Sequence, residues 1–305
     1  MQADLIIKPQ EGPQTEFAST PADIAVIGGS AGGGKTWSLL IEPLRHIHVP
    51  GFTCVYFRRT YPELRAPDSA WDQSFKLYRH IEGATPREHD MVWTFKTSNS
   101  NVYNTIKFSH MQHESDINNW LSSQICLILF DELVTFTEKQ FFYMLSRNRS
   151  TCGIKPYVRA SCNPDPTSWV FRFLAPWVDD EFPNPAKSGE IRYMLRSNDS
   201  IAWVPKGTPY AKSVTFIRAS VYDNKVLMDS NPDYIANLMA LNYVDRMRLL
   251  EGSWKLMLPG DMFRLSWFND KYVDKEDVPT SNIRYVRYWD LAAQSERASN
   301  RYAVN

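Results

Sequence analysis

The sequence predicts an α/β fold with a mainly parallel central sheet, and two observations carry this prediction. Short apolar runs of strand length alternate along the chain with helical patterns, and a glycine-rich segment directly follows the first apolar run. This alternation is typical of an open sheet whose strands are mostly parallel. The runs expected to form strands are 24–27, 53–58, 125–130, 158–162 and 213–218.

Two segments depart from this alternation. Residues 92–95 and 105–110 alternate in polarity like antiparallel strands around turn residues 97–101, which predicts a hairpin inserted at the sheet edge. Residues 232–250 have a helical pattern broken near Asn242, with apolar positions at Leu238, Leu241, Met247, Leu249 and Leu250. We therefore expect three regions: a core over 1–225, a small helical lid or linker subdomain over 226–258, and a C-terminal region over 259–305 that contains a strand at 284–290.

The composition is that of a chain with a large apolar core, since 43% of its 305 residues are hydrophobic. Lys+Arg and Asp+Glu both number 34, so the net charge is zero and no overall positive field attracts nucleic acid. The cysteines, Cys54, Cys126, Cys152 and Cys162, lack C-x-x-C spacing, which indicates a reducing compartment and makes a zinc site unexpected. Because no apolar stretch approaches the length of a bilayer span and residues 1–10 lack a signal-peptide pattern, we expect a soluble cytoplasmic protein.

The glycine-rich segment from Gly29 to Thr36 satisfies the P-loop pattern G-x-x-x-x-G-K-[ST]. Glycines let the backbone curl so that successive N–H groups face phosphate oxygens. We expect Gly29, Ser30, Ala31, Gly32, Gly33 and Gly34 to cradle the phosphates of ATP, Lys35 to reach the β- and γ-phosphates, and the Thr36 hydroxyl to bind Mg²⁺. A helix over 37–47 would direct its positive end at the same phosphates. The alternative is a glycine-rich turn that matches by chance, and the strand before and helix after argue against it.

The apolar strand at 127–130 ends in two adjacent carboxylates, Asp131 and Glu132. In a P-loop ATPase this arrangement is the Walker B motif, in which the first acid holds Mg²⁺ and the second polarises the attacking water. We assign these roles to Asp131 and Glu132 respectively. A pair of acids in which one can act on water favours hydrolysis over phosphoryl transfer to a second substrate. On its own the pattern would mark only a strand end, and the upstream P-loop is what supports the functional interpretation.

The next expected strand closes with Asn163 and Pro164. A polar side chain at that position would face the γ-phosphate, and Asn163 could bond both the phosphate and the attacking water. The alternative is an Asn-Pro turn that merely ends a strand.

Taken in order, the segments GGSAGGGKT, YFRRTYPEL, LILFDE, SRNRS, ASCNPDP, LLEGSW and RYWDLA resemble the large terminase subunit of tailed bacteriophages, and the similarity covers almost the whole chain. The resemblance implies an N-terminal ATPase of the ASCE type, a lid subdomain and a C-terminal nuclease of the RNase H type. It also implies that Gln14, with Phe17, contacts adenine and that 161–163 couples hydrolysis to movement. The implied partners are double-stranded DNA, the portal protein, the small terminase subunit and further copies in a ring on the procapsid. The implied location is the host cytoplasm, without stable incorporation into the virion.

One departure from the family lies in the P-loop. Several terminases carry an arginine there that stabilises charge in the transition state, whereas residues 30–33 here include none. An arginine of this kind is worth on the order of 10³-fold or more in rate, so the charge must come from elsewhere. Our candidates are Arg147 and Arg149, reaching the ATP of a neighbouring subunit, with Arg58 and Arg59 as second choices.

A second departure lies at the C-terminal end. Residues 288–292 resemble the first nuclease strand, in which Asp290 would be one carboxylate of a two-metal site. Such a site needs further carboxylates from later strands, and the sequence stops at Asn305. We therefore expect no nuclease activity from this chain as it stands, with a nuclease metal only in a complete chain.

DNA contact requires clustered basic side chains. The best clusters are Arg58, Arg59 and Arg65 near Tyr61, and Lys96 with Lys107 around the expected hairpin. Because the net charge is zero, we expect weak, salt-dependent binding of duplex DNA by one subunit, which a ring of copies would multiply.

Two other classes of function remain open. One is a different P-loop enzyme, such as a helicase-like NTPase, which single-stranded rather than duplex DNA would stimulate. The other is an assembly subunit that binds nucleotide without hydrolysing it. Glu132 argues against the latter, because such a protein would not need an acid to act on water.

Overall fold

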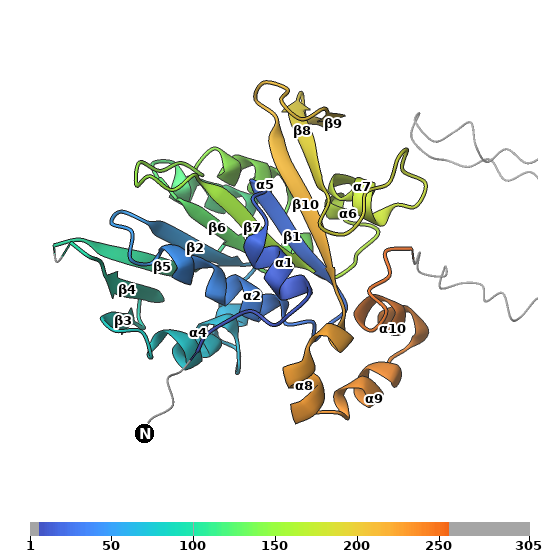
Figure 1. Cartoon of the computed structure of the whole chain (residues 1–305), viewed down its shortest axis with the longest axis horizontal. Helices are drawn as coiled ribbons and strands as arrows, with labels where there is room; N and C mark the ends of the chain where they lie inside the picture. Colours follow the sequence, from blue (N-terminus) through green and yellow to red (C-terminus); the bar gives the residue numbers. More distant parts are fainter. Residues whose placement is uncertain (1–5, 100, 256–305) are drawn as a thin grey trace, which may run out of the picture. The chain divides into compact units, whose positions relative to one another are not determined.

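Ten strands form one sheet among residues 6–99 and 101–255, the part of the chain that the computed structural model describes (Figure 1). Their order across the sheet is β3-β4-β5-β2-β6-β7-β1-β10-β8-β9. The strands are β1 (Ile24–Gly29), β2 (Thr53–Arg58), β3 (Ala84–Arg87), β4 (Val92–Lys96), β5 (Tyr103–His110), β6 (Leu127–Phe130), β7 (Tyr157–Cys162), β8 (Ile191–Ser197), β9 (Ser200–Val204) and β10 (Lys212–Ala219). The strands from β5 to β10 in this order are parallel, and antiparallel strands extend the sheet at both edges.

The five apolar runs predicted as strands all form strands, with shifts of one or two residues at some ends. The predicted hairpin is also present as β4 and β5, but β5 pairs in parallel with β2 and therefore belongs to the main sheet. The sequence analysis missed β3, β8 and β9. These strands lie at or next to the sheet edges and mix charged with apolar residues, so they lack the continuous apolar run of a central strand.

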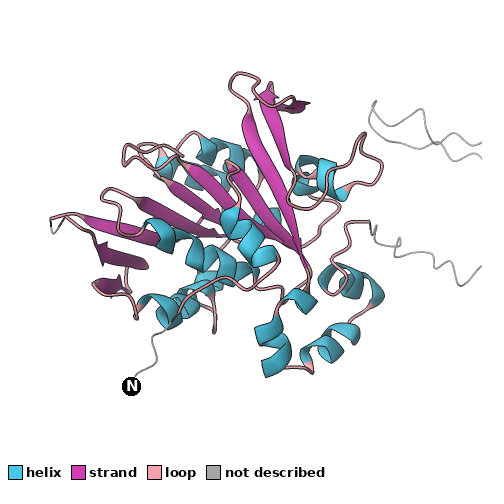
Figure 2. Cartoon of the chain, in the orientation of Figure 1, coloured by secondary structure: helices cyan, strands magenta, loops and turns pink. Residues whose placement is uncertain are grey.

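Helices cover both faces of the sheet (Figure 2). The described α-helices are α1 (Pro13–Ser19), α2 (Lys35–Ile41), α3 (Tyr61–Arg65), α4 (Ala70–Tyr78), α5 (Glu138–Leu145), α6 (Trp169–Phe173), α7 (Ala175–Val178), α8 (Lys225–Ser230), α9 (Tyr234–Met239) and α10 (Tyr243–Leu249). The described 3₁₀ helices are η1 (Glu42–His46), η2 (Glu114–Trp120), η3 (Leu133–Thr135) and η4 (Val221–Asp223).

Alternate residues of the central strands supply two separate hydrophobic cores. On β1, Ile24 and Val26 face the core shared with α5, α6 and α7, whereas Ala25 and Ile27 face the core shared with α1, α2 and α4. The strands β1, β6 and β7 are buried at every residue, which is expected for parallel strands covered on both faces. Because these strands are packed on both faces, their carboxyl ends are fixed side by side at one edge of the sheet.

The helix after the P-loop differs from the expected span of 37–47. It begins at Lys35, ends at Ile41 and continues as the 3₁₀ helix η1. The change occurs because Pro43 has no N–H to donate to the carbonyl of Leu39, so the α-helical pattern cannot continue.

The segment expected to be helical over 232–250 forms α9 and α10, and the predicted break at Asn242 is confirmed. Asn242 caps α10, since its side-chain Oδ1 accepts a hydrogen bond of 3.0 Å from the Asp245 N–H. A small core of Val221, Leu238 and Leu250 holds these helices together.

The expected strand at 284–290, with Asp290 and the rest of 259–305, lies outside the described residues, so the domain boundaries and the nuclease expectation stay predictions. Within the described residues, no helix is long and apolar enough to cross a membrane.

Candidate nucleotide site

The P-loop and the residues Asp131, Glu132 and Asn163, all predicted from the sequence, meet at the carboxyl edge of the parallel strands. Strand register explains this arrangement: Gly28 pairs with Cys162, Phe130 with Ala160, and Phe57 with Phe130. The residues that follow these positions on β1, β7, β6 and β2 are therefore neighbours. They are Gly29 at the start of the P-loop, Ser161 and Asn163, Asp131, and Arg58.

The P-loop connects β1 to α2, as its sequence pattern predicted. Gly34 is the residue before α2 and has φ +73° and ψ +21°, a left-handed conformation that side chains disfavour. A Cβ at Gly34 would lie 2.2 Å from Nε2 of Gln14, so glycine is also required for space. The structure thus places the buried Gln14 of α1 directly against the P-loop.

Lys35, Asn163 and Glu132 form a chain of hydrogen bonds. Nζ of Lys35 donates to Oδ1 of Asn163 over 2.9 Å, and Nδ2 of Asn163 donates to Oε1 of Glu132 over 2.8 Å. The amide of Asn163 therefore links the P-loop cation to the second acid of the Walker B motif. All three side chains come from different elements, so only the folded sheet brings them together.

The Walker B acids are held by Ser161. Its hydroxyl donates to Oδ1 of Asp131 over 2.6 Å and accepts from the backbone N–H of Glu132 over 3.0 Å. Glu132 itself has φ +59°, a left-handed conformation that costs a non-glycine residue of order 1–3 kcal/mol. The N–H bond from Glu132 to Ser161 helps to maintain this turn, which directs the carboxylate toward Asn163.

Burial changes the acidity of both ends of this chain. The Lys35 side chain is almost fully buried, and desolvation lowers its pKa although Glu132 and Asp131 oppose the change. Burial and the neighbouring Asp131 charge raise the pKa of Glu132, and Lys35 and Arg58 offset part of that increase. A carboxylate whose pKa is raised is a stronger proton acceptor, which suits a residue that activates water.

Arg58 also lies in the site. Its Nη1 is 3.3 Å from Oδ2 of Asp131 and 4.0 Å from Oε1 of Glu132. Asp131 and Glu132 are thus flanked by two cations, Lys35 and Arg58.

The N-terminal segment also contacts the P-loop region, through Asn224 at the start of α8. The Gln10 side chain donates to Asn224 Oδ1 over 2.8 Å, and Asn224 Nδ2 donates to the Gly32 carbonyl over 2.7 Å. The backbone N–H of Gln10 donates to Oε1 of Gln14 over 3.0 Å. Gln14 is therefore positioned by contacts that the sequence did not indicate, because Gln10 and Asn224 are more than 200 residues apart.

The helix α10 contacts two parts of the site through consecutive residues. Nε of Arg248 donates to the carbonyl of Pro164 over 2.9 Å, and the carbonyl of Leu249 accepts from the N–H of Ala31 over 2.6 Å. The helix α10 thus bonds both the P-loop and the residue that follows Asn163.

Arg147 and Arg149 lie at the opposite, amino edge of the sheet. Their segment is anchored there by Asn148, whose Nδ2 donates to the carbonyls of Ile125 and Cys126 at 3.0 and 2.9 Å. Arg147 donates to the carbonyl of Leu121 and lies over the ring of Tyr143. Arg149 is exposed, and among the described residues its side chain makes no hydrogen bond or ion pair.

Several of the predicted DNA-binding residues make contacts within the chain. Arg59 donates to Oε1 of Gln140 over 2.6 Å, and Arg65 donates to the carbonyl of Glu88 over 2.9 Å. Lys107 is exposed on β5 with its Nζ over Trp120, whereas Lys96 pairs with Tyr103 at the far end of the β4–β5 hairpin. A role of these residues in DNA binding stays a prediction.

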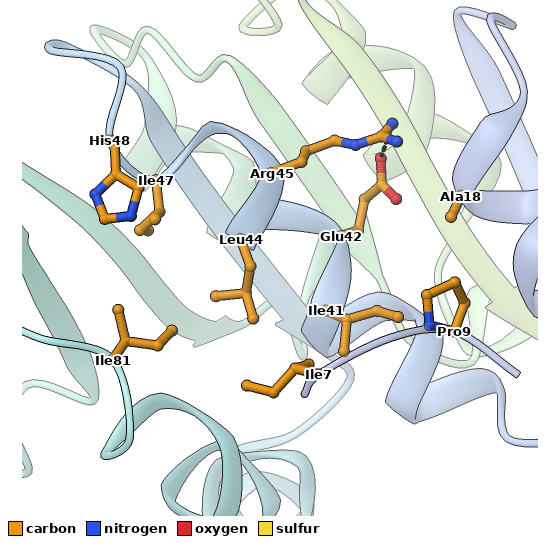
Figure 3. A pocket seen from close by; sticks show the side chains of 10 residues that line it. All are labelled: Ile7, Pro9, Ala18, Ile41, Glu42, Leu44, Arg45, Ile47, His48 and Ile81. Carbon is orange, nitrogen blue, oxygen red and sulfur yellow. Dashed lines mark hydrogen bonds and ion pairs between the residues drawn. The ribbon is translucent and has the colours of Figure 1, made fainter. Parts of the chain in front are cut away.

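A separate cavity of about 430 Å³ lies beside the end of α2 and the 3₁₀ helix η1 (Figure 3). Figure 3 shows Ile7, Ile41, Leu44 and Ile81 along it, with the ion pair between Arg45 and Glu42 on one side. None of its lining residues belongs to the P-loop.

Ser161, Gln10 and Asn224 are site residues to which the analysis of the motifs gave no individual role. Ser161 could have been found, because it stands two residues before Asn163 at the end of a strand that neighbours β6. No sequence motif around Gln10 or Asn224 indicated that these residues contact the nucleotide site.

No curated protein matches the sequence. Among solved structures, the large terminase of a thermophilic bacteriophage is similar with a TM-score of 0.57 and 14% identity, over 85% of this chain and 57% of that one. The large terminase ATPase domain of a Thermus phage is similar with a TM-score of 0.53 and 10% identity, over 81% of this chain and 94% of that one. The terminase of the same thermophilic bacteriophage in complex with ADP has a TM-score of 0.51 and 15% identity, over 80% of this chain and 53% of that one.

This chain therefore spans little more than half the length of the thermophilic bacteriophage protein, and at such identities the likeness concerns the fold. The family of the chain is shown by a match to a protein-family model. The model of the terminase large subunit, T4-like virus type, N-terminal part, matches residues 26–270. The chain belongs to the terminase large subunit family.

Proposed function

We propose that this chain is the ATP-hydrolysing motor subunit that moves double-stranded viral DNA into a procapsid. The observation that carries the proposal is the hydrogen-bonded chain of Lys35, Asn163 and Glu132. It joins a cation suited to phosphate oxygens, an amide that would face the γ-phosphate, and an acid suited to activating water. Family membership and the ADP complex of the thermophilic bacteriophage terminase support ATP as the substrate.

The site offers suitable groups for MgATP. Mg²⁺ takes oxygen ligands, and the buried Asp131 carboxylate and the Thr36 hydroxyl beside Lys35 would hold it. The ion would neutralise charge on the β- and γ-phosphates. Lys35 would hold the same phosphates, and Gln14, which lies against the P-loop, would contact adenine.

Hydrolysis requires a group that takes a proton from water. Glu132 would act as this base, and Asn163, which donates to its Oε1, would orient it relative to the γ-phosphate. The bond from Arg248 to Pro164 offers a route by which a change at Asn163 reaches the lid.

The position of Arg149 favours action on a neighbouring copy. It lies at the amino edge of the sheet, while the site of its own chain lies at the carboxyl edge. We infer that copies of this chain form a ring in which Arg149, or Arg147 beside it, completes the site of the next subunit. Duplex DNA, the portal protein and the small terminase subunit are the partners that such a motor requires.

The test is steady-state ATP hydrolysis by the wild type and by Glu132→Gln, with duplex DNA and portal protein present or absent. We expect the substitution to lower kcat by about 10²- to 10⁴-fold, because it removes a general base while keeping the shape of the side chain. Binding of a fluorescent ADP analogue should be retained.

Glu114→Gln is the matched control, since Glu114 is an exposed acid that pairs with Lys139 away from the site. Nucleotide binding without turnover by the wild type would indicate an assembly subunit. Stimulation by single-stranded rather than duplex DNA would indicate a helicase-like enzyme.

A further inference from the structure

Arg58 is surrounded by three carboxylates. Besides Asp131 at 3.3 Å and Glu132 at 4.0 Å, its Nε lies 3.8 Å from Oε2 of Glu63. The Arg58 side chain is 26% exposed, so the guanidinium is partly desolvated. Ion pairs that are shielded from water are stronger than those on an open surface.

The backbone positions Arg58 for these contacts. It is the last residue of β2, and the pairing of Phe57 with Phe130 places it level with Asp131 on the neighbouring strand. The N–H of Asp131 also donates to the carbonyl of Phe57 over 2.9 Å, which continues the pairing past the end of β6.

Glu63, on helix α3, is the third carboxylate that contacts Arg58. It is the third residue of α3, where its N–H donates to the Thr60 hydroxyl over 3.4 Å and its carboxylate accepts from the Thr60 N–H over 3.2 Å. This reciprocal capping limits the positions that the Glu63 carboxylate can take. Arg58 is therefore held between a fixed helix cap and the Walker B motif.

The two Walker B acids need a nearby positive charge, which Arg58 can supply. Asp131 and Glu132 are adjacent and largely buried, so their negative charges repel each other strongly. Lys35 reaches Glu132 only through Asn163, and Arg58 lies within ion-pair distance of both acids. The Arg58 guanidinium is positively charged throughout the physiological pH range, as arginine side chains are in proteins.

We propose that Arg58 acts within its own subunit as a positioning residue that holds and neutralises the Asp131–Glu132 pair from β2. It would supply, from a neighbouring strand, a positive charge that residues 30–33 of the P-loop do not carry. This inference rests on the proposed ATPase function and adds a residue to that site. It gives Arg58 a role different from binding the DNA backbone, because its charge is already engaged by carboxylates.

The test compares Arg58→Ala and Arg58→Lys with the wild type by measuring kcat for ATP hydrolysis and the Kd of a fluorescent ADP analogue. We expect Arg58→Ala to lower kcat roughly 10- to 100-fold, similar in size to the loss of one interaction with a charged group, while the Kd changes less than about threefold. Arg58→Lys should recover part of the rate, since it keeps the charge but not the planar fork. Millimolar guanidinium ion should also raise the rate of Arg58→Ala, which a purely structural defect would not allow.

Arg87→Ala is the control, because Arg87 is an exposed arginine whose ion pair with Asp90 lies away from the site. The proposal is overturned if Arg58→Ala hydrolyses ATP within about twofold of the wild type, or if Kd rises as much as kcat falls. It is also overturned if Arg58→Ala loses only duplex DNA binding, which would make Arg58 a DNA contact.

If Arg58→Ala does not fold, which its melting curve would show, the Arg58→Lys and Arg58→Gln pair answers the same question through the presence or absence of charge. A wild type that binds and hydrolyses no ATP would instead refute the proposed function. The two failures are therefore distinguishable.

Discussion

The two ends of strands β6 and β7 differ sharply in what they present. At the carboxyl edge, Asp131, Glu132 and Asn163 are tied into a network with Ser161 and Lys35. At the amino edge, a well-anchored backbone presents an arginine whose side chain is exposed. Hydrogen bonds fix the side chains at the carboxyl edge in one geometry, whereas the Arg149 side chain at the amino edge is exposed.

The helix α5 makes this difference possible. It lies in the segment that leads from the Walker B acids back to Asn148, and Asn148 pairs with Ile125, two residues before β6. Ile125 and Asp131 are six residues apart, about 20 Å at the rise of a strand. A subunit therefore cannot bring Arg149 to its own Asp131 without unfolding this crossover. The comparison teaches that the acids and the P-loop lie at one edge of the sheet, whereas the exposed Arg149 lies at the other.

The largest expected effect comes from Arg149. In the wild type, the ATPase rate per subunit should rise with protein concentration as neighbours supply this residue, and Arg149→Ala should lower the rate at high concentration by about 10³-fold. At low concentration the two proteins should differ little. The measurement is ATPase activity over a concentration series, with Arg147→Ala in parallel to decide which arginine acts.

A mixing experiment sharpens this prediction. Lys35→Ala and Arg149→Ala should each be inactive alone, yet a mixture should recover activity, because the Lys35→Ala subunit carries an intact Arg149. No recovery at any ratio, with assembly confirmed by light scattering, would show that Arg149 does not act on a neighbour.

The next effect concerns Asn163, at the carboxyl edge. Asn163→Ala removes the bonds to Lys35 and Glu132, and each bond to a charged group is worth about 1.5–3 kcal/mol. We expect kcat to fall roughly 10- to 100-fold with nucleotide binding largely kept. Single-turnover hydrolysis measures this loss, and an equal loss in nucleotide binding would mean that Asn163 only shapes the P-loop.

The smallest effect concerns Asn148, at the amino edge. Its side chain donates to the carbonyls of Ile125, Cys126 and Tyr157, so Asn148→Ala leaves these groups without that donor. We expect the free energy of unfolding to fall by about 1–3 kcal/mol, measured by urea denaturation. Asn101→Ala, in the exposed β4–β5 turn, is the control. Equal stability of the two variants would show that Asn148 does not anchor the segment.

The carboxyl edge was the more predictable of the two. A strand buried on both faces is mostly apolar, so β1, β2, β6, β7 and β10 were visible as runs, and the polar residues that end them stood out as site candidates. The strands β3, β8 and β9, at or next to the sheet edges, were not visible, because they are less buried and mix charged with apolar residues.

The sequence by itself determined the parts of the site that depend on local chemistry: the P-loop from Gly29 to Thr36, the acids Asp131 and Glu132, and Asn163. These can be read because glycines, a lysine and strand-ending polar residues must stand at set spacings along one segment. The tertiary structure decided the parts that depend on register and packing. It alone placed Arg58 beside Asp131, Asn224 beside Gly32, and Arg149 at the far edge, because pairing between strands and helices distant in sequence leaves no local pattern.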